Sequence, residues 1–106
     1  MVVIIKGIKY NVRILSKKSY TKKYSNSYAH VNRDSREIIF RDDHIKKTTV
    51  IHEVTHAFIN TLCLGSCNDL TLEDFEEIIC EMLEVHLMDI NRVSNEILSF
   101  LKEPKK

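Results

Sequence analysis

Hydrophobic and polar residues alternate from Tyr10 to Ile14, as they do in a half-buried β-strand, and short apolar segments in the rest of the first forty positions predict further strands. Gly7 separates the first two predicted strands, and a polar turn at 32–35 separates the last two. His30, in the third strand, is expected at the surface, where it could touch a substrate. The polar segment 17–27 is compatible with a turn of helix or with a loop. The predicted strands are residues 2–5, 10–15, 28–31 and 37–41.

The second half of the chain repeats its apolar residues every three or four positions, which predicts amphipathic helices. The first helix is predicted over residues 45–64, with Asp42 or Asp43 as its N-cap and Gly65 at its end. A loop at residues 67–69 follows it. The apolar stripe of this helix consists of Ile51, Val54, Phe58 and Leu62.

A second long helix is predicted to begin at Thr71, whose spacing to Asp74 is that of a capping box, and to reach about Asp89. A last helix is predicted over residues 94–101, before Pro104. The predicted fold class is therefore α+β, with a small N-terminal β-sheet followed by helices in one domain that spans residues 1–106. The stripe of the second helix consists of Phe75, Ile78, Ile79, Met82, Leu83 and His86.

The first predicted helix contains the sequence HExxH, from His52 to His56. Positions i and i+4 share one face of a helix, so both imidazoles can reach a single metal ion. Glu53 then lies near the open coordination position, where it can take a proton from a zinc-bound water. An amphipathic helix with two surface histidines would have the same sequence. The apolar stripe around the motif favours the zinc site, with Glu53 as the general base.

The composition is that of a folded protein, with 43% hydrophobic residues, two Gly and one Pro among 106 residues. No apolar run has the length of a membrane span, and the first residues lack the features of a signal peptide, so a cytoplasmic location is expected. The cysteines are expected to be reduced thiols, although the spacing of the first two would allow a metal clip. They are Cys63, Cys67 and Cys80.

Charges are segregated along the chain, although the formal net charge is only +1. Residues 1–33 contain eight basic residues and no acidic one, whereas residues 48–91 contain nine acidic residues and no Lys or Arg. A basic half could meet an acidic partner or nucleic acid. No aromatic-interleaved basic motif or helix-turn-helix pattern accompanies it, so nucleic acid is not the expected partner.

A catalytic zinc ion takes three protein ligands and keeps one open position. A metzincin would have a glycine and a third histidine at the positions of Ile59 and Leu62, so that class is excluded. Helical spacing alone does not decide between Glu76 and Glu77 as the third ligand. The candidates on the second helix are Glu73, Asp74, Glu76, Glu77, Glu81 and Glu84.

The segments TTVIHEVTHAF (48–58) and EEIICE (76–81) resemble small zinc metallopeptidase-like proteins that are common in phage and prophage genomes. These proteins are similar to the ImmA/IrrE type and to minimal gluzincins. The likeness extends to residues 7–10 and 37–40, and so covers most of the first ninety residues. It implies a zinc peptidase whose third ligand is a glutamate of the second helix.

The resemblance also selects among the glutamates. In gluzincin helices the ligand glutamate is followed by apolar residues one, two, five and six positions on, and Glu77 fits this pattern whereas Glu76 does not. Glu81 would then orient a ligand histidine, beside Cys80. Family members usually have Asp or Asn in place of Glu81, and Ala or Ser in place of Cys80.

The expected function is that of a zinc-dependent metallopeptidase, with Zn²⁺ held by His52, His56 and Glu77. Its substrate, a peptide or protein, is expected to pair with strand 28–31 or with residues 38–40. The resemblance implies a regulatory protein as the substrate. The alternative is a catalytically silent protein-binding module that zinc stabilises.

Overall fold

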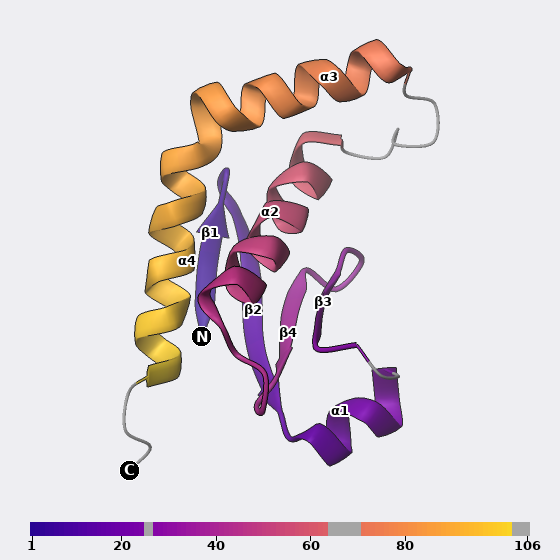
Figure 1. Cartoon of the computed structure of the whole chain (residues 1–106), viewed down its shortest axis with the longest axis vertical. Helices are drawn as coiled ribbons and strands as arrows, with labels where there is room; N and C mark the ends of the chain where they lie inside the picture. The colour runs from indigo at the N-terminus through magenta and orange to yellow at the C-terminus, as the bar shows by residue number, and fades with distance from the viewer. Residues whose placement is uncertain (25–26, 64–70, 103–106) are drawn as a thin grey trace.

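The computed structural model of the protein describes residues 1–24, 27–63 and 71–102. It confirms the α+β class, because a small sheet is completed before the HExxH helix begins. Figure 1 shows the elements, which in chain order are β1 (Val2–Ile5), β2 (Ile8–Leu15), α1 (Lys17–Tyr24), β3 (Ala29–Asn32), β4 (Glu37–Arg41), α2 (Lys47–Cys63), α3 (Leu72–Glu81), the π-helical turn η2 (Met82–His86) and α4 (Leu87–Lys102).

The four strands form one mixed sheet in the order β1-β2-β4-β3. β1 and β2 form an antiparallel hairpin, β2 and β4 are parallel, and β3 is antiparallel to β4. Gly7 lies in the hairpin turn with φ of 80°, a conformation that glycine adopts without a steric penalty. β3 is an edge strand, so one of its sides is not paired with another described strand.

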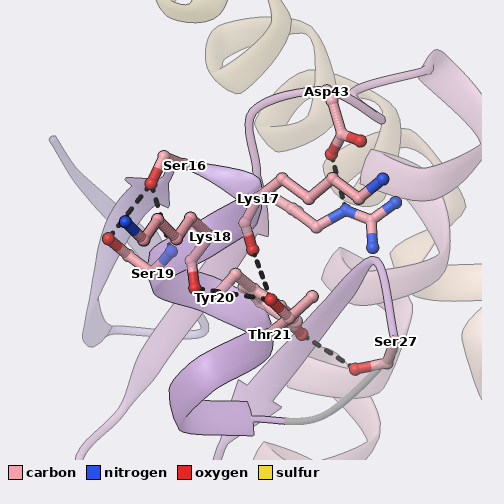
Figure 2. Close-up of polar contacts among 9 residues, drawn as sticks. Ser16, Lys17, Lys18, Ser19, Tyr20, Thr21, Ser27 and Asp43 are labelled. Atoms are coloured by element: carbon pink, nitrogen blue, oxygen red, sulfur yellow. Dashed lines mark hydrogen bonds and ion pairs between the residues drawn. The ribbon is translucent and has the colours of Figure 1, made fainter.

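The hydrophobic core lies between the sheet and the helices α2 and α4, which pack against each other on one face of it (Figure 1). On the opposite face, α1 carries Tyr20, which is fully buried and forms a hydrogen bond with Ser27 at 3.0 Å (Figure 2). The side chains of the core are Val3, Ile5, Tyr10, Val12, Ile38, Phe40, Val50, Val54, Ala57, Phe58, Met82, Ile90, Val93 and Ile97.

Several predicted boundaries differ from the structure. β3 spans Ala29–Asn32, one residue later than the predicted strand 28–31. β2 begins at Ile8, two residues before the predicted strand, because the whole hairpin register from Ile8 to Asn11 pairs with β1. α2 begins at Lys47, so neither Asp42 nor Asp43 caps it, and Asp43 instead accepts a hydrogen bond from Nε of Arg41. The predicted helix end at Gly65 and the loop 67–69, with Cys67, lie outside the described residues.

The segment 17–24, left open by the sequence, is helical. Ser16 Oγ accepts a hydrogen bond from the Ser19 amide at 3.2 Å, which is the contact of an N-cap serine. Thr21 Oγ1 donates to the Lys17 carbonyl at 2.8 Å within the helix (Figure 2). α1 therefore connects β2 to β3, and its buried Tyr20 covers part of the second face of the sheet.

The positions at which the C-terminal helices begin and are interrupted agree only in part with the prediction. The capping box is confirmed, because the side chains of Thr71 and Asp74 each accept a hydrogen bond from the other's backbone amide. The predicted break between residues 89 and 94 is wrong: α4 is continuous there, since Ile90 and Val93 are buried against the core. The interruption lies earlier, at η2, where Figure 1 shows α3 and α4 meeting at an angle.

α3 extends beyond the core and none of its residues is buried. Of the predicted apolar stripe only Met82 and His86 are buried, both in η2. Phe75 is 46% exposed and Ile79 is 57% exposed, whereas Ile78 is half-buried and packs against the edge of the core, so most of the α3 part of the stripe faces solvent. None of the described helices combines the length and hydropathy needed to cross a membrane.

Candidate metal centre

α2 places the HExxH residues on two sides of one helix. Val50, Val54, Ala57 and Phe58 recur at helical spacing and are at most 1% exposed, which fixes that face of α2 against the sheet. The histidines at positions 52 and 56 fall on the other face and are exposed. Burial of the apolar face therefore determines that both imidazoles face away from the core.

The two imidazoles converge. Nε2 of His52 lies 3.1 Å from Nε2 of His56, and the ring centroids are 4.7 Å apart at an interplanar angle of 76°. A tetrahedral zinc ion with bonds of about 2.0–2.1 Å, for comparison, would hold two nitrogen ligands about 3.3 Å apart. The spacing of the nitrogens thus suits two ligands of one metal ion.

Glu53 lies beside the histidines but is only 5% exposed. Its Oε2 is buried and has no hydrogen-bond partner among the described residues, which is costly for a carboxylate. Burial raises the pKa of Glu53 above its ordinary value, and the nearby His56 and His52 offset part of this rise. An unpartnered carboxylate next to two converging imidazoles fits a site completed by a cation.

His52, Glu53 and His56 form a possible metal-binding group, because one ligand atom from each lies within 4.8 Å of the others. Within the described parts of the chain, no second group of at least three His, Cys, Asp or Glu residues meets this criterion. The prediction that these three residues form one cluster is therefore confirmed. The cluster by itself does not specify which metal it binds.

A groove runs beside the cluster, between α2 and the edge strand β3. It consists of two adjoining hollows of about 350 Å³ and about 390 Å³, and Ala29, His52 and Glu53 line both of them. Tyr28, Thr48 and Thr49 complete the first hollow, and Ser27, His30, Val31, His56 and Asn60 complete the second.

The structure does not bring Glu77 to the histidines. Glu77 is exposed on α3, and its carboxylate is not part of the group of converging ligand atoms. Glu76, the other candidate for the third ligand, is exposed on the same helix. The physical reason is that α3 continues through η2 into α4, whose burial against α2 and β1 directs α3 across the far, C-terminal end of α2 (Figure 1).

The two residues predicted to support a ligand histidine also differ from the prediction. Oε1 of Glu81 lies 3.5 Å from Nε2 of His86, and Glu81 makes no contact of this kind with His52 or His56. Cys80 is a free, exposed thiol. The i→i+5 spacing of the π-helical turn brings Glu81 and His86 together, and sequence periodicity does not reveal such a turn.

Of the groove residues contributed by β3, the sequence offered His30 as a residue that could touch a substrate and segment 28–31 as one of two strands that could pair with it, whereas Ala29 and Val31 carry no motif of their own. These residues reach the site because β4, which pairs with β3, also pairs in parallel with β2 of the distant N-terminal hairpin, and this order leaves β3 at the edge of the sheet beside α2. Comparison of the chain with protein-family models, with curated proteins and with solved structures finds no match.

Proposed function

We propose that the protein is a zinc-dependent metallopeptidase that hydrolyses peptide bonds. The observation that carries this proposal is the convergence of the His52 and His56 imidazoles beside the buried carboxylate of Glu53, whose Oε2 has no hydrogen-bond partner in the part of the chain that the structure describes. Two nitrogen donors and one neighbouring base form the chemical set that hydrolytic zinc sites use. The proteins that the chain resembles point to the same activity.

Glu53 is the proton carrier in this proposal. Zinc, when bound, would polarise the peptide carbonyl and make a water molecule more acidic. Oε2 of Glu53 accepts the proton of the attacking water, and the same carboxyl then donates it to the leaving nitrogen. The raised pKa of Glu53 suits both steps, because burial makes its carboxylate a stronger base than an exposed one. His52 and His56 hold the metal.

The edge strand β3 is the proposed docking site for the substrate backbone. β4, the other candidate, is central in the sheet, and its Ile38, Ile39 and Phe40 are fully buried. β3 lines the groove and has an unpaired side among the described strands, so an extended peptide can add to it by main-chain hydrogen bonds. A regulatory protein with an exposed extended segment is the proposed substrate.

A peptide library tests this function. Protein loaded with one equivalent of zinc is incubated with a mixture of unstructured peptides, and new termini are identified by mass spectrometry. We expect cleavage with zinc and none after removal of the metal by a chelator. Absence of cleavage in zinc-loaded protein that has one bound zinc per chain would contradict the peptidase proposal.

The third ligand is proposed to be Glu77, which the resemblance assigns. Because Glu77 lies on α3, this proposal requires α3 to approach the metal-binding half of α2 when zinc is bound. The π-helical turn η2 is the place where the helix can bend, since its hydrogen-bond pattern already departs from that of an α-helix.

Replacing Glu77 with Gln is expected to weaken zinc binding about 100-fold, because even residues that only support metal ligands are worth about 10- to 100-fold in affinity. Glu76→Gln is the matched control on the same helix and is expected to leave the affinity unchanged. Competition with a chromophoric zinc chelator measures both. The opposite ranking would assign the third ligand to Glu76. If both variants bind zinc as tightly as the wild type, the third ligand lies outside this pair.

A further inference from the structure

We propose that the groove selects a substrate with an acidic side chain, which His30 and Lys23 bind on the α1 side of the edge strand. This inference rests on the proposed peptidase function and names the substrate class of the same site. Four features of the structure support it: the register of β3, the hydrogen bonds of His30, the aromatic contacts of His30, and the charges around it.

The register of β3 determines which substrate side chains meet His30. Successive side chains of a strand point to opposite faces of the sheet. Ala29 and Val31 pack against the core under α2, so His30, which is paired with Ile39, lies on the opposite face with α1. A substrate strand added to β3 alternates in the same way. Every second substrate side chain therefore points towards α1, while its neighbours face the metal-binding residues.

A buried tyrosine orients the His30 ring. The Tyr20 hydroxyl lies 2.8 Å from Nδ1 of His30 and 3.0 Å from Oγ of Ser27, a contact that Figure 2 draws. A phenol is a better donor than an imidazole N–H, and an imidazole nitrogen is a better acceptor than a serine hydroxyl. Tyr20 therefore donates to Nδ1, and the hydrogen of the neutral ring is on Nε2.

Nε2 of His30 is available to a ligand. It has no hydrogen-bond partner among the described residues, whereas Nδ1 is satisfied by Tyr20. Burial lowers the pKa of His30, so the ring is neutral at pH 7 and presents one N–H donor rather than a charge. His30 also lines the hollow that contains Glu53 and both metal-binding histidines. A side chain that binds at His30 thus belongs to a substrate that reaches the metal centre.

Lysines at the end of α1 supply the positive charge. The Tyr24 ring packs on His30 with a centroid distance of 4.3 Å, and Nζ of Lys23 lies 5.4 Å from the centroid of Tyr24. Glu37, whose negative charge acts on His30, is paired with Arg13 at 3.1 Å and also lies within the electrostatic reach of Lys23, so these two cations offset its charge. A substrate carboxylate would meet an N–H donor and an ammonium group, whereas a substrate lysine would meet like charge.

The test uses a peptide cleaved in the library experiment, synthesised with Glu, Gln or Lys in turn at each position near the cut. Affinity is measured by fluorescence anisotropy on the zinc-loaded Glu53→Gln protein, and kcat/KM is measured on the wild type. We expect one position at which Glu is preferred over Lys by about two- to fivefold, the range that a single exposed charge pair supports.

Substitutions identify the residues responsible. Lys23→Glu is expected to abolish or invert the preference, whereas Lys17→Glu, at the start of the same helix, is the matched control and should keep it. Both lysines are exposed, so neither change threatens the fold. Tyr20→Phe is expected to reduce the preference for Glu and to shift the His30 tautomer, which long-range ¹H–¹⁵N spectra report, because it removes the hydroxyl that lies 2.8 Å from Nδ1.

The possible outcomes separate this inference from the proposed function. Cleavage with equal affinity for the Glu and Lys peptides at every position would overturn the inference and leave the peptidase standing. A preference for Glu that survives Lys23→Glu would also overturn it. Absence of cleavage of any peptide by wild-type protein would contradict the proposed function, and with it the substrate class.

Discussion

The Glu53→Gln variant is expected to lose peptide cleavage by about 100- to 10 000-fold, the usual contribution of a positioned general base. Zinc binding should be retained at one equivalent, because the proposed ligands are His52, His56 and Glu77. Gln has nearly the same shape as Glu but cannot take the proton of the attacking water. Initial rates on a peptide from the library, at matched zinc content, measure the effect.

The same variant has an expected effect on stability. Burial raises the pKa of Glu53 in the folded state, so its stabilising contribution is complete below the ordinary carboxyl pKa and is lost as pH rises through the raised value. Gln carries no charge and avoids this loss. In metal-free protein at neutral pH we therefore expect the unfolding midpoint of Glu53→Gln to be no lower than that of the wild type.

The control for Glu53→Gln is Glu73→Gln, an equivalent change at an exposed position in the first turn of α3. It should leave both cleavage and zinc content unchanged. A Glu53→Gln protein that cleaves as fast as the wild type would contradict the role given to Glu53. If neither the wild type nor Glu53→Gln cleaves peptides but both bind zinc, the result would support the alternative function, a protein-binding module that zinc stabilises.

The second large effect is expected from His56→Ala, which should reduce bound zinc from one equivalent to none. Removing one of two converging imidazoles leaves a single nitrogen donor, and the Nε2–Nε2 geometry that fits one ion is lost. Elemental analysis of purified protein measures the zinc content. His52→Ala should behave in the same way, since the two histidines are equivalent in this arrangement.

Zinc should also stabilise the wild type against unfolding but not His56→Ala. A ligand at about 100 times its Kd, bound only by the folded state, adds about 2.7 kcal/mol to the free energy of unfolding. Thermal unfolding with and without zinc measures this gain. His44→Ala, which removes a histidine that stacks on Tyr28 outside α2, is the control and should keep the gain. Equal zinc content in wild type and His56→Ala would rule out the proposed site.

The sequence predicted the parts of this protein that depend on local spacing. The HExxH residues share a helix because an apolar stripe with helical spacing surrounds them, and the i, i+4 interval alone brings the imidazoles of His52 and His56 together. The capping box at Thr71 is equally local and was also predicted correctly. These features need no knowledge of residues elsewhere in the chain.

Features that depend on distant packing were not available from the sequence. Helical periodicity did not reveal the π-helical turn η2, which pairs Glu81 with His86 and sets the direction of α3. Strand patterns alone did not show that β3, rather than β4, is the edge strand beside the site, because strand order is set by pairing between remote segments.

The amino-acid sequence by itself thus determined the α+β class and the cluster of His52, Glu53 and His56, since both follow from the periodicity of neighbouring residues. Only the tertiary structure decided that Glu53 is buried with no partner for Oε2 among the described residues, that β3 and His30 border the groove, and where the glutamates of α3 lie. The reason is that burial, strand order and helix direction are fixed by contacts between segments far apart in the chain, which local patterns do not encode.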